Sequence, residues 1–185
     1  SDNIKAEAET GQKKIVYITK ETTLEMGECL DTPRSYRFIA GEDRIVLCGH
    51  DERGAAQASY YLEDLMNFNH APIVEKADES RKPHFSPRMI HSGYGLDMFP
   101  DAHLNKIAHA GMDAILVFTK DVDTTPQGYL DFNELIYRAA AYGIDVYAYS
   151  YLKSIKHPEA ADAEEYYDGT YGRVFEKCPG LKGIV

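Results

Sequence analysis

Polar and aromatic side chains lie at the ends of three apolar runs in the second half of the sequence. His91 lies in the first run, Asp121 follows the second, and Tyr149 and Tyr151 close the third. An imidazole and a carboxylate form hydrogen bonds with hydroxyl groups, and a tyrosine offers both a ring face and a hydroxyl. The set therefore suits a polyhydroxylated ligand. A strand histidine or a loop carboxylate also occurs without any ligand, and tyrosines favour strands in general.

Other kinds of catalytic centre are not indicated. The three cysteines, Cys29, Cys48 and Cys178, form no C-x-x-C pair, and neither H-E-x-x-H nor G-x-S-x-G occurs. These absences argue against a zinc site and a serine hydrolase. The G-x-G at residues 93–95 lacks the third glycine of a dinucleotide loop, and no phosphate-loop motif is present. We therefore expect no metal and no cofactor.

The elements that position these side chains alternate between strand and helix. Apolar strands are predicted at residues 89–94, 114–119, 145–150 and 181–185, with helices starting near residues 101 and 131 and a third at about 163–177. Continuous apolar strands that alternate with helices predict a parallel sheet covered on both faces. Three tyrosines of the last helix are expected to pack against its surroundings: Tyr166, Tyr167 and Tyr171.

Two of these helices have recognisable ends. Asp101 is predicted to cap the first helix, and Gly111 to end it. Asp131 and Glu134 have the spacing of a capping box at the start of the second helix, with aspartate in place of serine or threonine.

The first half of the sequence has a different order. A strand is predicted at residues 14–19, a hairpin at 36–48, and a helix that begins at Asp51. Residues 75–87 are charged and contain two prolines, so we expect a linker there. These features predict two domains, an α+β domain at residues 1–82 and an α/β domain at residues 83–185.

Two architectures fit the second domain, a doubly wound sheet and a (β/α)8 TIM barrel. The missing phosphate loops make the doubly wound sheet the weaker alternative. A barrel takes about 250 residues, so the four predicted strands amount to the first half of one. The expected fold class is α/β, with a small α+β domain followed by half a barrel that belongs to a longer protein.

Composition excludes several partners. The chain has 185 residues, 20 basic and 30 acidic, and a formal net charge of -10. An acidic protein is a poor binder of phosphate backbones, so no nucleic acid is expected. No apolar run is long enough to span a membrane, and the first residues show no signal peptide pattern. The charge and the tyrosine content favour an extracytoplasmic bacterial protein that handles polysaccharide.

A family resemblance is carried by residues 44–121. The run Ile45-Val46-Leu47-Cys48-Gly49-His50-Asp51-Glu52-Arg53-Gly54-Ala55 leads into a helix, and Pro83-His84-Phe85-Ser86-Pro87-Arg88 leads into a strand. This layout resembles glycoside hydrolase family 20, the β-N-acetylhexosaminidases, which carry a small α+β domain directly before a (β/α)8 barrel. Their junction ends in Arg-Gly, whereas Met89 follows Arg88 here. Divergent relatives of the α-glucuronidase type share the layout.

The resemblance implies that the intact protein cleaves O-glycosidic bonds in an oligosaccharide or polysaccharide. It implies that Arg88 binds the sugar, and that Asp97 matches the aspartate of a Leu-Asp pair in the family. The family's catalytic Asp-Glu pair follows the fourth barrel strand, which places it beyond Val185 and leaves this chain inactive by itself. The expected substrate-binding set is Arg88, His91, Asp97, Asp121, Tyr149 and Tyr151. The alternative is a non-catalytic carbohydrate-binding or structural module of the same layout.

Overall fold

The structure is a computed structural model that describes residues 14–19, 30–91, 98–150 and 155–185. The chain divides into two compact units, Ser1–Ser86 and Pro87–Val185. The division lies within the proline-bounded junction that the sequence indicates, a few residues after the predicted boundary at 82. Each unit has its own sheet, and the two are described separately below.

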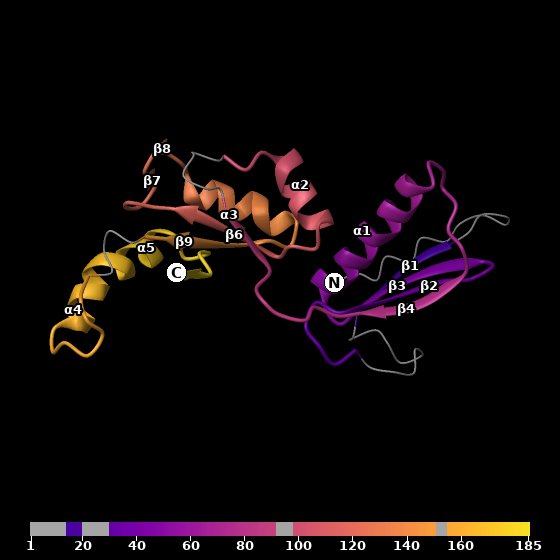
Figure 1. The fold of residues 1–185 in the computed structure, drawn as a ribbon, viewed down its shortest axis with the longest axis horizontal. Helices are drawn as coiled ribbons and strands as arrows, with labels where there is room; N and C mark the ends of the chain where they lie inside the picture. Colours follow the sequence, from indigo (N-terminus) through magenta and orange to yellow (C-terminus); the bar gives the residue numbers. More distant parts are fainter. Residues whose placement is uncertain (1–13, 20–29, 92–97, 151–154) are drawn as a thin grey trace. The chain divides into compact units, whose positions relative to one another are not determined.

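The first unit is a four-stranded sheet with one long helix (Figure 1). The strands lie in the order β1 (Lys14–Thr19), β3 (Arg44–Gly49), β2 (Tyr36–Ala40) and β4 (Ala77–Arg81). β1 runs parallel to β3, whereas β2 is antiparallel to both β3 and β4. Alternate residues of β2 and β3 face α1 (Glu52–Phe68), and Phe38 and Leu47 are fully buried against Leu62 of that helix.

The turn from β3 into α1 explains the glycines of the motif at residues 45–55. A Cβ atom on Gly49 would lie 2.1 Å from the amide nitrogen of Ala55, and one on Gly54 would lie 2.2 Å from the Ser35 carbonyl oxygen. Only glycine permits this close approach of backbones. Asp51 caps the helix as predicted, because its Oδ1 accepts from the Gly54 amide at 2.7 Å.

The predicted linker at residues 75–87 is wrong in part, because residues 77–81 form the edge strand β4. Because most of its side chains are polar or charged, composition alone does not reveal this strand. They are matched by partners on other elements: Asp78 accepts from Arg37 of β2 at 2.7 Å, and Arg81 lies 4.2 Å over the ring of Tyr61. Charged side chains are a common feature of edge strands, where they discourage pairing with other chains.

The second unit contains a parallel sheet in the order β5 (Met89–His91), β6 (Ala114–Phe118), β9 (Asp145–Tyr149) and β10 (Gly183–Ile184). Helices α2 (Asp101–His109) and α3 (Phe132–Ala141) connect the first three strands, with a small hairpin of β7 (Thr124–Thr125) and β8 (Gly128–Tyr129) before α3. Each strand pairs with the next one along the chain. Doubly wound sheets reverse their order at a switch point, and these four strands do not.

The two faces of this sheet differ. Ile115, Val117 and Val146 are almost fully buried on the face against which the helices pack, and α2 and α3 lie on one side of the sheet in Figure 1. Phe118 and Tyr149 point to the opposite face and are only half-buried among the described residues. The sequence predicts helices on both faces of the sheet. In the part of the chain that is described, helices cover one face.

The amino-terminal caps agree with the sequence at α3 but not at α2, whereas Gly111 ends α2 as predicted, with a φ of 77° directly after the C-cap Ala110. Asp131 accepts from the Glu134 amide at 2.9 Å and caps α3. At α2 the N-cap is Pro100, and Asp101 lies in the first turn with its carboxylate 3.3 Å from Arg138. An acidic residue in the first turn still favours the helix through its dipole, which is why sequence alone does not separate the two roles.

The predicted helix at 163–177 forms in three pieces. α4 (Ala163–Tyr167) continues into a π-helical segment, η2 (Asp168–Gly172), and then into α5 (Arg173–Lys177). Two glycines, Gly169 and Gly172, fall in the π-helical segment. Short π-helical insertions are rare and often occur at functional sites.

Candidate functional site

Three aromatic side chains form a row across the carboxyl ends of the parallel strands. His91 ends β5, Phe118 ends β6 and Tyr149 ends β9. The His91 and Phe118 ring centroids are 6.1 Å apart and those of Phe118 and Tyr149 are 5.3 Å apart, both edge to face. Phe118 and Tyr149 are register partners, so the pleat places them on the same face. We call His91, Phe118 and Tyr149 the aromatic row.

Asp121 lies just past the end of β6, in the turn that starts the β7–β8 hairpin. Its Oδ1 accepts from the Val122 amide at 2.8 Å, and its Oδ2 accepts from Nη2 of Arg173 at 3.2 Å. The Thr119 hydroxyl donates to the Asp121 carbonyl oxygen. The side chain keeps 36% of its surface exposed. The turn therefore fixes this carboxylate at the strand end while leaving it accessible to a ligand.

Two residues that the sequence did not single out as binding residues join this region. The Tyr171 hydroxyl donates to the Ser150 carbonyl oxygen at 3.0 Å, directly after β9, and Arg173 makes the ion pair with Asp121. Both come from the helical stretch at 163–177. They lie more than twenty residues along the chain from their partners, so no local spacing reveals the contacts. The glycines of η2 are the one local feature that distinguishes this stretch from an ordinary helix.

Arg88 lies at the opposite end of the strands from the aromatic row. Its backbone amide donates to Asp113 Oδ1 at 2.7 Å, and its Nε donates to Asp113 Oδ2 at 3.2 Å. The Asp113 side chain is only 4% exposed. This pair joins the amino ends of β5 and β6 and accounts for the arginine without a ligand. The binding role that the resemblance implies for Arg88 stays a prediction.

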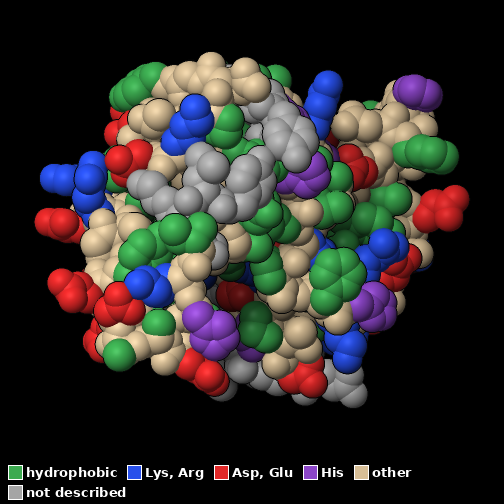
Figure 2. All heavy atoms as spheres, turned by 60° about the vertical axis from the view of Figure 1, so that its left-hand side comes forward, with side chains coloured by type: hydrophobic (Ala, Val, Ile, Leu, Met, Phe, Trp, Pro, Cys, Tyr) green, Lys and Arg blue, Asp and Glu red, His purple; other side chains and the backbone are tan. Residues whose placement is uncertain are grey.

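Two predicted binding residues, Asp97 and Tyr151, lie outside the described residues. Within the described ranges, no three histidine, cysteine, aspartate or glutamate side chains gather to hold a metal ion. None of the helices in those ranges is both long and apolar enough to cross a bilayer. On the face shown in Figure 2, acidic and basic side chains are interspersed with apolar ones.

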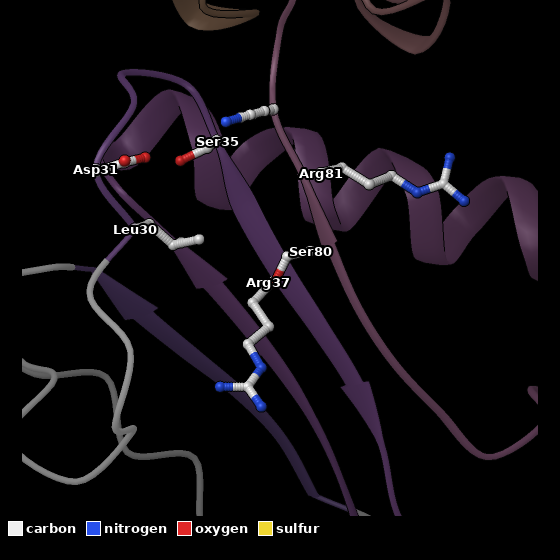
Figure 3. A pocket seen from close by; sticks show the side chains of 7 residues that line it. Leu30, Asp31, Ser35, Arg37, Ser80 and Arg81 are labelled. Atoms are coloured by element: carbon white, nitrogen blue, oxygen red, sulfur yellow. The ribbon is translucent and has the colours of Figure 1, made fainter.

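A pocket of about 320 Å³ in the first unit is a weaker candidate. Arg37 and Ser80 line it from the sheet, and Asp31 and Ser35 from the preceding turn (Figure 3). Arg37, Arg81 and Asp31 have partners within the protein. The two hydrogen bonds from Arg37 lower the pKa of Asp78, and a hydrogen bond from Thr32, with help from Lys82, lowers the pKa of Asp31. These paired charges therefore give no indication of a bound ligand.

Comparison with known proteins identifies solved structures with a similar fold. No family model and no curated protein matches the chain. Among solved structures, the chain is similar to a glycoside hydrolase family 20 β-N-acetylglucosaminidase, with a TM-score of 0.57 and 18% identity over 77% of this chain and 34% of that one. It is also similar to the structure of CpGH84B, with a TM-score of 0.60 and 14% identity over 89% of this chain and 31% of that one.

These similarities show that the fold is glycoside hydrolase-like. The chain spans about a third of the length of the structures that it matches. At this level of identity the likeness concerns the fold alone.

Proposed function

We propose that this chain is part of a glycoside hydrolase and that the aromatic row binds a sugar ring of the substrate. The observation that carries the proposal is the position of the row, at the carboxyl ends of parallel strands that follow one another in sequence order. This order supports a (β/α)8 barrel over a doubly wound sheet. Barrel enzymes hold their active sites at the carboxyl ends of the strands.

The chemistry of the row and its neighbour suits a sugar. One side of a pyranose ring is lined by C–H groups, which pack against an aromatic ring, while its hydroxyls lie at the edge. Phe118 offers an apolar ring between Tyr149 and His91, which also carry hydrogen-bonding groups. The Asp121 carboxylate is an acceptor for a charge-assisted bond from a sugar hydroxyl. We propose these four residues as the sugar contacts.

Hydrolysis itself needs a carboxylic acid that donates its proton to the glycosidic oxygen as the C–O bond breaks, and water completes the reaction at the sugar carbon. We propose that a part of the protein following β10 supplies this acid, since the similar structures are about two to three times the length of this chain. N-acetylglucosamine is the first sugar to test, because one of those structures is a β-N-acetylglucosaminidase.

The test of the sugar site uses the 185-residue chain and calorimetric titration with methyl glycosides of N-acetylglucosamine, glucose, galactose and glucuronic acid. We expect at least one to bind. Tyr149→Ala should weaken that binding by about three- to tenfold, which corresponds to the roughly 0.5–1.5 kcal/mol typical of an aromatic contact. Tyr137→Ala is the matched control, because Tyr137 is 81% exposed on α3.

Failure of all four glycosides to bind would overturn the sugar site. Equal effects of the two tyrosine variants would also overturn it. Binding of a sugar without hydrolysis of its aryl glycoside by the whole protein would favour the alternative, a carbohydrate-binding module of the same layout.

A further inference from the structure

Three more tyrosines lie in the helical stretch at 163–177, which contacts the residue that follows β9. The Tyr167 and Tyr171 rings are stacked, with centroids 5.7 Å apart and planes 11° apart. Tyr166 meets Tyr167 edge to face at 5.2 Å. Tyr171 is tied to the sheet through the hydrogen bond from its hydroxyl to Ser150, the residue after Tyr149. We call Tyr166, Tyr167 and Tyr171 the tyrosine ladder.

Hydrogen bonds to backbone carbonyl oxygens hold the rings of Tyr167 and Tyr171, and the Lys156 ammonium lies 5.6 Å from the centre of the Tyr166 ring. The Tyr167 hydroxyl donates to the Lys156 carbonyl oxygen, and the Thr170 hydroxyl donates to the Tyr166 carbonyl oxygen at 2.9 Å. All three tyrosines are nevertheless only half-buried. Rings fixed before binding lose little conformational entropy when a ligand arrives.

The backbone of the ladder departs from an ordinary helix. Tyr171 lies in η2, whose Gly169 and Gly172 cost helix stability relative to alanine. A larger residue would fit at position 169, because a Cβ atom there would have no heavy atom within 4 Å. Packing alone therefore does not explain why a segment that lowers helix stability is present here.

We propose that the tyrosine ladder is a second saccharide subsite, which binds a further sugar ring of a chain whose first ring lies on the aromatic row. The inference rests on the proposed function and extends it to the substrate class. The row and the ladder together present six aromatic rings, more than one pyranose ring covers. The ligand is accordingly an oligosaccharide or polysaccharide.

The test compares ligand lengths on the 185-residue chain. Tyrosine fluorescence follows binding, since the chain has 14 tyrosines and no tryptophan whose emission would mask theirs. The probes are N-acetylglucosamine and its β-1,4-linked tetramer, or the corresponding monomer and tetramer of whichever methyl glycoside binds in the first experiment. We expect the tetramer to bind at least fivefold more tightly than the monomer.

Tyr167→Ala should remove that gain while leaving the monomer affinity unchanged. Tyr167→Phe keeps the stacked ring and loses only the hydroxyl, so it should retain most of the gain. Tyr137→Ala, far along the sequence on the exposed side of α3, should change neither affinity. If Tyr167→Ala alters the fold, the phenylalanine variant and the length dependence of the wild-type chain still decide the question.

The outcomes are distinguishable. Equal affinity for monomer and tetramer, or a tetramer gain that survives in Tyr167→Ala, overturns the second subsite and leaves the proposed function standing. Absence of binding by any monomer and any tetramer overturns the proposed function and the subsite together.

Discussion

The ion pair between Arg88 and Asp113 should be the most sensitive polar contact of the second unit. The Asp113 side chain is 4% exposed and that of Arg88 is 21% exposed. The carboxylate accepts from the Arg88 amide at 2.7 Å and from its Nε at 3.2 Å. Asp113→Ala leaves both donors without this acceptor in a place that water barely reaches.

Loss of one partner of a buried pair costs about 3–5 kcal/mol. Because the guanidinium keeps some access to water, we expect the lower end, about 3 kcal/mol. Asp113→Asn keeps an acceptor oxygen for the Arg88 amide and loses the charge, so about 1–2 kcal/mol is expected. Asp101→Asn is the matched control, since its carboxylate is largely exposed at 3.3 Å from Arg138 and should change stability by no more than about 0.5 kcal/mol.

Hydrogen exchange is the appropriate assay, because the chain has two compact units and a global unfolding curve mixes them. The amides of Ile115 and Val117 in β6 report the opening free energy of the second unit itself. A change below about 1 kcal/mol in Asp113→Ala, or an equal change in Asp101→Asn, would refute the reasoning.

Three further predictions concern other parts of the chain. Asp51→Ala removes the acceptor for the Gly54 and Arg34 amides and should destabilise the first unit by about 1–2 kcal/mol, seen as faster hydrogen exchange of the β3 amides; no loss would contradict the capping role. Gly169→Ala should raise the stability of the second unit by about 0.5–1 kcal/mol, seen as slower hydrogen exchange, because the added methyl group enters open space in a helical segment. Arg37→Gln should raise the pKa of Asp78 toward its ordinary value in a carboxyl NMR titration. The hydrogen bonds from Arg37 lower that pKa, so the stability that they give is present above the unfolded-state pKa of about 3.9 and lost as pH falls through the lower folded value; an unchanged pKa would show that the pair does not persist in solution.

Local patterns were enough to predict most of the elements. The apolar run at 114–119 and the spacing of Asp131 and Glu134 both depend on neighbours in sequence, and the structure has β6 and the α3 cap there. The tight turn at Gly49 is also local in its cause, since the close approach that it permits is to the amide nitrogen of Ala55. Such features are determined within a few residues.

Contacts between distant residues could not be predicted in the same way. The edge strand β4 is stabilised by partners on β2 and α1, so its composition alone suggests a linker. The pair of Arg173 with Asp121 joins residues 52 apart, and the sequence gives no reason to connect them. His91, Asp121 and Tyr149 were predicted because strand ends in a parallel sheet lie at one edge, whereas Phe118 was overlooked as an ordinary apolar strand residue.

The central claim is that the carboxyl ends of the parallel strands bind a sugar. The most direct measurement is an NMR titration of the chain with methyl glycosides, observing the ring resonances of His91, Phe118 and Tyr149. The account predicts that a binding glycoside shifts these three rings, with Tyr137 and the aromatic side chains of the first unit unchanged. Shifts confined to the first unit, such as the ring of Tyr61 on α1, would contradict it, as would a sugar that binds without moving the aromatic row.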